Sequence, residues 1–158
     1  MTEPKSLQIP DGMVCITTHG SVTVETMQAY SDMRSFCEGH GLRNVAWQPI
    51  MKSLVDKARN DATQKMLSNP KCDYLFFLDA DMQWRHDLLA IILQTAYGDL
   101  PQADVVGGWC PLRGDPYLPT IDTGTGTWES TLPGQGPVEV IRTGGACLLI
   151  KRHVLERI

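Results

Sequence analysis

Apolar positions along the chain fall into two patterns, short continuous runs and longer segments with helical spacing. The continuous runs predict strands at residues 12–17, 44–48, 73–78, 104–106, 138–141 and 146–150. The helical spacing predicts helices at residues 24–38, 53–68 and 88–97, with a further helix beginning at Lys151. Strands that alternate with helices over short connections are typical of an α/β fold with a mostly parallel central sheet.

The helical segments also predict which side chains are buried. Ser53 and Asp87 stand where the second and third helices begin, and both residue types are favoured as N-caps. The expected apolar faces of the first two helices are Met27, Tyr30, Met33 and Cys37, and Leu54, Ala58, Ala62 and Met66. Residues 1–11 form a polar lead-in, and residues 12–158 are interpreted as a single domain. Residues 107–137 are rich in Gly, Pro and Thr, and so long a loop is typical of a lid or binding loop.

Charge and cysteine content exclude several classes of protein. The net charge is -4, which argues against a nucleic-acid-binding surface because such a surface needs basic residues. The five cysteines are widely spread and form no C-x-x-C pair, so we expect reduced thiols and a cytoplasmic protein. Cys15, Cys72 and Cys147 lie in or beside apolar runs and are expected as small core residues. Neither a signal peptide nor a transmembrane segment is visible.

The most informative stretch is the apolar run that ends in Asp79-Ala80-Asp81. Ligands of parallel sheets bind outside the carboxyl ends of the strands, which places residues 17–19, 79–81 and 107–108 at one edge. If the backbone stays extended, the two carboxylates point the same way and can share a hard divalent cation such as Mg²⁺ or Mn²⁺. The alternative is that Asp79 caps a turn and Asp81 is merely solvated.

Three segments together resemble the donor-binding core of GT-A glycosyltransferases of the family 2 type. They are SLVDKARNDATQKMLSNPKCDYLFFLDADM, VIRTGGACLLIKRHVLERI and MVCITTHGSVTVET, and the resemblance covers most of residues 12–158. A D-x-D alone is a weak signal, whereas the ordered combination is fairly specific. The resemblance implies a Rossmann-like GT-A sandwich and transfer of a sugar from a UDP or GDP type donor to an acceptor that the sequence does not identify.

The same resemblance implies roles for individual residues. Asp81 would coordinate a Mn²⁺ or Mg²⁺ ion against the donor diphosphate, Asp79 would contact the ribose or the metal, and Ala80 is the spacer between them. The remaining expected donor-side residues are Thr17, Thr18 and His19 near the base or ribose, Arg59 and Asn60 beside the D-x-D loop, and Gly144 and Gly145, where the backbone would approach the sugar or acceptor.

Several of these residues have a purely structural alternative. Arg59 can instead form a surface ion pair with Asp56 or Asp73. Trp84 and Trp109 can stack a sugar or base, or can be half-buried packing residues.

No acceptor-activating base is predicted. Asp115, Asp122 and Glu129 are loop carboxylates, and their spacing selects none of them. The family's base lies in a later acidic motif, and the chain ends at Ile158 before it, so we expect the domain to be incomplete at its C-terminus. Inverting and retaining outcomes stay open.

Three other functions are weighed against glycosyl transfer: donor binding without catalysis, nucleotidyl transfer on a similar sheet, and a haloacid-dehalogenase-like phosphatase. The phosphatase ranks lowest, because Gln83 stands where its motif needs Thr or Val.

Overall fold

The computed structural model describes residues 9–18, 20–51, 54–110, 121–124 and 136–158. The strands are β1 (Gly12–Thr18), β2 (Val45–Met51), β3 (Tyr74–Asp79), β4 (Val105–Gly107), β5 (Ile121–Asp122), β6 (Arg142–Thr143) and β7 (Cys147–Lys151). The helices are α1 (Val24–Gly39), α2 (Val55–Ser68), α3 (Leu88–Leu93) and α4 (Arg152–Leu155), and a π-helical turn η1 (Gln94–Asp99) continues α3.

A five-stranded sheet in the order β2-β1-β3-β7-β4 forms the centre of the molecule. Strand β1 runs parallel to β2 and β3, whereas β7 runs antiparallel to β3 and β4. The prediction of a mixed α/β fold with a mostly parallel central sheet is therefore confirmed. Residues 74–78 of β3 are buried on both faces, as a central strand of such a sheet requires.

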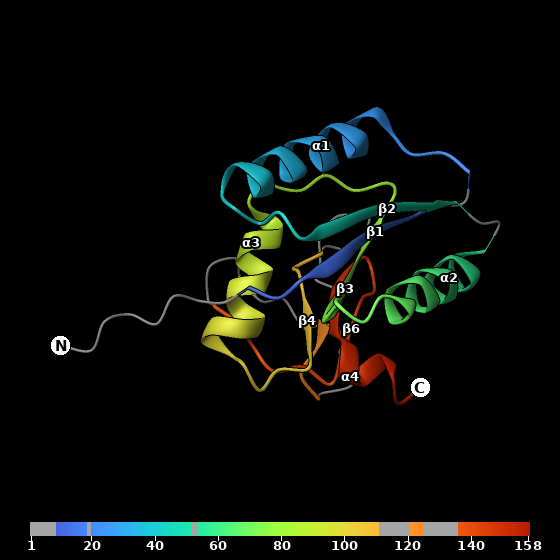
Figure 1. Cartoon of the computed structure of the whole chain (residues 1–158). Coiled ribbons are helices and arrows are strands. Elements are labelled where there is room, and N and C mark those ends of the chain that lie inside the picture. Colours follow the sequence, from blue (N-terminus) through green and yellow to red (C-terminus); the bar gives the residue numbers. More distant parts are fainter. Residues whose placement is uncertain (1–8, 19, 52–53, 111–120, 125–135) are drawn as a thin grey trace.

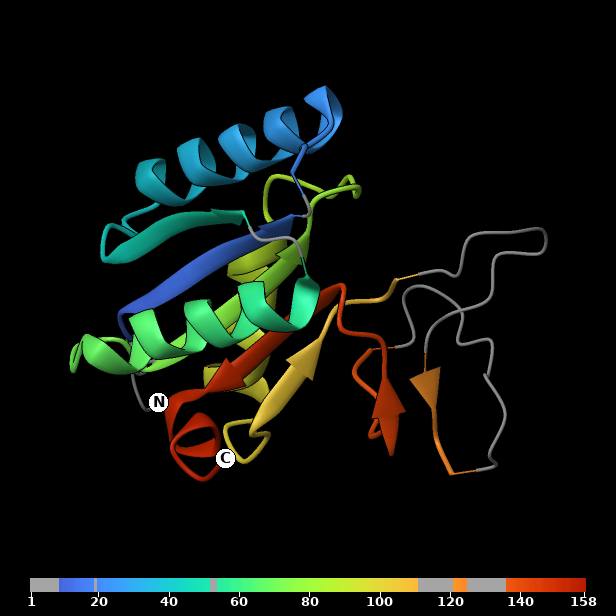
Figure 2. The same cartoon turned by 90° about the vertical axis from the view of Figure 1, so that its right-hand side faces the viewer.

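Helices cover both faces of this sheet and create two separate cores (Figures 1 and 2). Helices α1 and α3 pack on one face, where Tyr30 and Leu89 belong to the same buried cluster as Phe76. Helices α2 and α4 pack on the other face, where Met66 and Leu155 meet Phe77. Figure 2 shows α2 in front of the sheet and α3 behind it. Successive residues of β3 thus contribute alternately to the two cores.

Helix α1 starts at a side-chain cap and ends in glycine. The Thr23 hydroxyl accepts a hydrogen bond from the Thr26 amide at 3.1 Å, which satisfies one of the free amides of the first turn. The predicted buried residues Tyr30, Met33 and Cys37 face the core. Met27 was expected on that face but is 45% exposed, and Thr26 and Ala29 are buried instead. The buried face of α1 therefore runs through Thr26 and Ala29 instead of Met27.

The starts of helices α2 and α3 differ in part from the predictions. In α2, Ala58, Ala62 and Met66 are buried as predicted, but Leu54 is the exposed N-cap residue, and Ser53 lies outside the described residues. Asp87 is the N-cap residue of α3 as predicted, but its side chain makes no capping hydrogen bond and accepts hydrogen bonds from Arg85 instead. The helix predicted over 88–97 is α-helical only to Leu93 and then widens into η1.

The strand predicted at residues 138–141 is wrong. Residues 136–140 have no regular structure, and the strand β6 begins later, at Arg142, where it pairs with β5. Figure 2 shows this two-stranded ribbon to one side of the main sheet. Within the described ranges, no helix has the length and apolarity needed to cross a lipid bilayer.

Candidate functional site

Strands β1 and β3 end together at one edge of the sheet, which we call the carboxyl edge. Their parallel register pairs Thr17 with Asp79. The buried Thr17 hydroxyl donates a hydrogen bond of 3.3 Å to Asp79 Oδ1. The sequence predicted both residues at one edge, and the structure brings their side chains into contact.

Arg59 joins three separate parts of the chain at this edge. Its Nη2 donates to Asp79 Oδ1 at 3.1 Å and to the Gly145 carbonyl at 2.8 Å, while its guanidinium lies 5.6 Å from the centre of the Phe77 ring. Its Nε is buried and has no hydrogen-bond partner among the described residues. Neither Asp56 nor Asp73, the two surface partners considered from the sequence, takes the ion pair. The side chain is instead held over the end of β3, about one-third exposed.

Gly145 leaves room for the Arg59 guanidinium, which lies directly above it. A Cβ atom at residue 145 would lie 2.5 Å from Arg59 Nη1, so the guanidinium would have to move to admit a larger residue. The next residue, Ala146, accepts a hydrogen bond of 3.0 Å from the Asp79 amide. The Gly-Gly turn was predicted to let a ligand approach the backbone. In the structure, the side chain that approaches Gly145 is Arg59, and half-buried Gly144 precedes it.

The backbone of the D-x-D segment is not extended, contrary to the assumption made from the sequence. Strand β3 ends at Asp79, and Ala80 and Asp81 form a turn in which Asp81 is exposed. The turn is anchored to the start of α1. The Thr23 amide donates to the Ala80 carbonyl at 3.4 Å, and the fully buried Thr26 hydroxyl donates to the Met82 carbonyl at 2.7 Å. These two threonine contacts join residues far apart in sequence, and no sequence pattern predicted them.

The other predicted donor-side residues are arranged less tightly. Thr18 is buried, and its hydroxyl donates to the Ser21 carbonyl, so it stabilises the turn after β1. Asn60 follows Arg59 on α2 and is exposed. His19 lies outside the described residues. Of the loop carboxylates considered as a base, Asp115 and Glu129 also lie outside them, and Asp122 is buried and paired with Arg142.

Asp79 and Asp81 are the carboxylates predicted to hold a metal at this edge. Both described hydrogen bonds to the Asp79 carboxylate end on Oδ1. No group of three or more His, Cys, Asp or Glu side chains within the described part of the chain has metal-site geometry. Mg²⁺ is typically bound through one or two carboxylates together with phosphates and water. Asp79 and Asp81 are compatible with that kind of site.

A cavity of about 180 Å³ lies next to this edge. Trp84 and Trp109 both line it, so the structure brings together two aromatic residues that the sequence left unassigned. The Trp84 indole Nε1 is buried without a hydrogen-bond partner in the described ranges. Most of the other lining side chains are apolar, and they come from the end of β3, the segment before α3, α3 itself, the chain after β4 and the start of β7: Leu78, Met82, Leu88, Ile91, Cys110 and Cys147.

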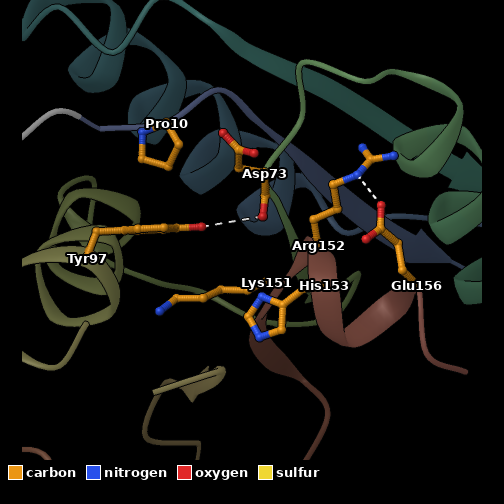
Figure 3. Close-up of a pocket in the computed structure, with 7 residues that line it drawn as sticks. All are labelled: Pro10, Asp73, Tyr97, Lys151, Arg152, His153 and Glu156. Atoms are coloured by element: carbon orange, nitrogen blue, oxygen red, sulfur yellow. Dashed lines mark hydrogen bonds and ion pairs between the residues drawn. The ribbon is translucent and has the colours of Figure 1, made fainter. Parts of the chain in front are cut away.

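A larger cavity, of about 340 Å³, lies near the start of β3, at the edge of the sheet opposite the carboxyl edge (Figure 3). We call this the opposite edge. It is lined by Pro10, Asp73, Tyr97, Lys151, Arg152, His153 and Glu156. Its basic side chains are engaged within the protein. Lys151 Nζ donates to the Pro101 carbonyl at 2.6 Å, and Arg152 donates to three backbone carbonyls and to Glu156. We therefore place the candidate site at the carboxyl edge.

Comparisons with known proteins agree with the fold and leave the activity open. No protein-family profile matches the chain, and no curated protein matches it significantly. Among solved structures, A197 from STIV is similar over 94% of this chain and 68% of its own, with 22% identity and a TM-score of 0.60. The 4-diphosphocytidyl-2C-methyl-D-erythritol synthase from Anaerococcus prevotii DSM 20548 is 8% identical, with a TM-score of 0.47 over 93% of this chain and 76% of its own. The first similarity indicates a shared fold alone, and the second is too weak to support an argument. Membership of glycosyltransferase family 2 stays a prediction.

Proposed function

We propose that the chain has a GT-A fold and is a metal-dependent glycosyltransferase, which transfers a sugar from a nucleotide-diphosphate donor of the UDP or GDP type. The observation that carries the proposal is the arrangement around Asp79. Its carboxylate is held at the end of the central strand by Arg59 and Thr17, and the exposed Asp81 follows it in an anchored turn. A carboxylate held in place at the end of the central strand, with a second carboxylate in the turn that follows, suits a diphosphate and its metal.

Each residue has a separate task in this proposal. Asp81, with Asp79, would hold a Mn²⁺ or Mg²⁺ ion, which when bound offsets negative charge on the departing diphosphate as a Lewis acid. Arg59 fixes the rotamer of Asp79 and adds positive charge beside the phosphates. Thr17 holds the same carboxylate from the neighbouring strand. Because these groups are already bonded to one another, little conformational entropy is lost when the donor binds.

The cavity beside the edge is the proposed position of the transferred sugar or of the acceptor. Trp84 and Trp109 offer ring faces of the kind that bind the apolar faces of sugars, and Gln83 and Asp87 add polar groups at the same cavity. We assign no acceptor-activating base. Asp122, the loop carboxylate that the structure describes, is engaged with Arg142 in the β5–β6 ribbon.

Isothermal titration calorimetry tests the proposal directly. The native chain is titrated with UDP, GDP and their sugars, with and without Mn²⁺, and the products are followed in the presence of candidate acceptors. We expect binding of one nucleoside diphosphate that depends on the metal. Absence of metal-dependent binding to every one of these ligands would contradict the proposal. Binding without turnover would favour a donor-binding domain, and turnover of nucleoside triphosphates would favour nucleotidyl transfer.

Asp81→Ala is the variant that tests the metal site. It should remove the metal-dependent part of donor binding while leaving the fold intact, because Asp81 is exposed. Asp32→Ala, which removes an exposed carboxylate on α1 that accepts a hydrogen bond from Gln28, is the matched control and should leave donor binding unchanged. If both variants bind the donor and metal as the native chain does, Asp81 does not hold the metal.

A further inference from the structure

Two cysteines that are distant in the sequence meet where β4 and β7 pair. Gly107 lies opposite Leu148 in this antiparallel pair, and the Gly108 amide donates to the Cys147 carbonyl at 2.9 Å. The Cys147 thiol lies directly against Gly108, since a Cβ atom at residue 108 would be 2.4 Å from its Sγ. Cys110 follows two residues later in the chain, and its thiol is hydrogen-bonded to that of Cys147.

Both thiols are buried, yet both line a cavity. Cys110 is 5% exposed and Cys147 is 3% exposed. They form part of the wall of the cavity of about 180 Å³ that also contains Trp84 and Trp109. A water molecule takes up about 30 Å³ in the liquid, so the cavity has room for several waters or for a small hydroperoxide beside the thiols. Because each thiol exposes so little of its own surface, small reagents reach it more readily than bulky ones.

The hydrogen bond between the thiols makes them chemically unequal. Cys147 donates to Cys110, which stabilises a thiolate on Cys110 and lowers the pKa of its thiol. The same bond, together with burial, raises the pKa of Cys147 and keeps it protonated. Because the thiolate is the nucleophilic form of cysteine, Cys110 is the thiol that can attack an electrophile, and Cys147 is the neighbour that can respond.

We propose that Cys110 and Cys147 form a redox-active dithiol at the β4–β7 pair, with hydrogen peroxide or another small hydroperoxide as its oxidant. The Cys110 thiolate attacks the peroxide oxygen, the O–O bond breaks, and with one proton the products are Cys110 sulfenic acid and water or an alcohol. Cys147 then attacks the Cys110 sulfur as its own proton passes to the departing hydroxyl group of the sulfenic acid, so that one water leaves and the disulfide forms. Two electrons pass to the peroxide, and a dithiol reductant restores the two thiols.

The other three cysteines provide an internal comparison. Burial raises the pKa of Cys15 to about 12 and that of Cys37 to about 11, and it also raises the pKa of Cys72. All three are buried in the two cores, and none of them lines the cavity. They should stay reduced under conditions in which the dithiol is oxidised. This inference concerns the thiols themselves and does not depend on the proposed glycosyl transfer.

The test is thiol mapping of the full native chain. The reduced protein is treated with hydrogen peroxide, the reaction is stopped with catalase, and free thiols are blocked with N-ethylmaleimide after unfolding. We expect a peptide cross-linked through Cys110 and Cys147, formed at least about tenfold faster than any oxidation of Cys15, Cys37 or Cys72, and reversed by dithiothreitol. Absence of this cross-link, or oxidation of all five cysteines at similar rates, overturns the proposal.

Single variants test the order of the two steps. In Cys147→Ser the sulfenic acid of Cys110 should accumulate and react with dimedone, whereas in Cys110→Ser residue 147 should stay a free thiol. Cys37→Ser, which removes a core thiol, is the matched control and should form the cross-link like the native chain. Lack of dimedone labelling in a folded Cys147→Ser chain contradicts the mechanism. If the variants do not fold, as judged by circular dichroism, the rate comparison in the native chain still decides the proposal.

Discussion

The two edges of the sheet both combine charged side chains with a cavity, but they use their charges differently. At the opposite edge, Arg152 Nη1 donates to the Asn69 and Cys72 carbonyls at 3.0 Å each, and Nη2 donates to the Leu67 carbonyl at 2.9 Å. Lys151 Nζ lies 5.0 Å from the centre of the Tyr97 ring, in addition to its bond to a carbonyl. The cations of this edge therefore hold the backbone of the protein together.

At the carboxyl edge, the charged side chains of Arg59 and Asp79 bind each other, and Arg59 makes one further bond to a backbone carbonyl. Arg59 and Asp79 are each about one-third exposed, and Asp81 is exposed beside them. The cavity at this edge is the smaller one, about 180 Å³ against 340 Å³. Cavity volume and charge therefore do not by themselves identify a binding site. What matters is whether the polar groups retain exposed surface for a ligand after the chain has folded.

Arg152→Ala should have the largest effect and should act on stability. Its side chain makes charge-assisted hydrogen bonds to three carbonyls, and losing them should lower the free energy of unfolding by about 2–3 kcal/mol. Urea denaturation followed by circular dichroism measures this change. Donor affinity of the folded fraction should not change. Arg34→Ala, at an exposed pair with Glu38, is the control and should have no measurable effect on stability. Equal effects of the two variants would show that the hydrogen bonds of Arg152 to these carbonyls do not stabilise the fold.

Asp79→Ala should show the reverse behaviour. Removing this carboxylate should weaken donor binding by roughly 30-fold, or about 2 kcal/mol, because Arg59 and the metal site lose their common partner. Stability should fall by about 1 kcal/mol or less, since the ion pair is partly exposed. Calorimetry and urea denaturation together separate the two effects. Asp73→Ala, at the residue that directly precedes the same strand, should leave donor affinity unchanged. A loss of affinity in both variants would remove the distinction between the edges.

Gly145→Ala should weaken donor binding about tenfold by displacing Arg59. The added methyl group takes the space of the guanidinium, so Arg59 must give up its bonds to Asp79 and to the Gly145 carbonyl. Because the displaced atoms are the end of a flexible side chain, stability should change much less than affinity. Gly39→Ala, where a Cβ meets nothing within 4 Å, is the control. Unchanged donor affinity in the Gly145 variant would show that Arg59 does not need its present position.

Thr17→Val should have the smallest effect. It keeps the shape of the side chain and removes a hydroxyl whose hydrogen bond to Asp79 is long, 3.3 Å, so donor affinity should fall only about threefold, or 0.5–1 kcal/mol. Thr95→Val, which removes a hydroxyl that donates to the backbone carbonyl of Ile91 four residues earlier, should leave affinity unchanged. A loss as large as that of Asp79→Ala would mean that Thr17 contacts the donor itself.

Elements with strong periodicity were predicted correctly, and weakly patterned ones were not. Strand β3 and helix α2 follow directly from their apolar spacing, since every residue of a strand buried on both faces, or every third to fourth residue of a helix, faces a core. The strand expected at 138–141 failed because the segment lies outside the main sheet, where burial does not select a strand. Met27 was misplaced because helical spacing alone does not choose between two adjacent stripes on a helix.

Local residue spacing was sufficient to predict the layered α/β fold, the position of Asp79 and Asp81 at the end of the central strand, and the helix that carries Arg59. The reason is that the periodicity of apolar residues reflects contacts with a core on a known face of each element. Three contacts became visible only in the folded chain: Arg59 pairs with Asp79 and lies above Gly145, α1 anchors the Ala80–Asp81 turn, and Cys110 meets Cys147. Such contacts join elements distant in sequence, and only the packing of the two layers on the sheet brings them within bonding distance.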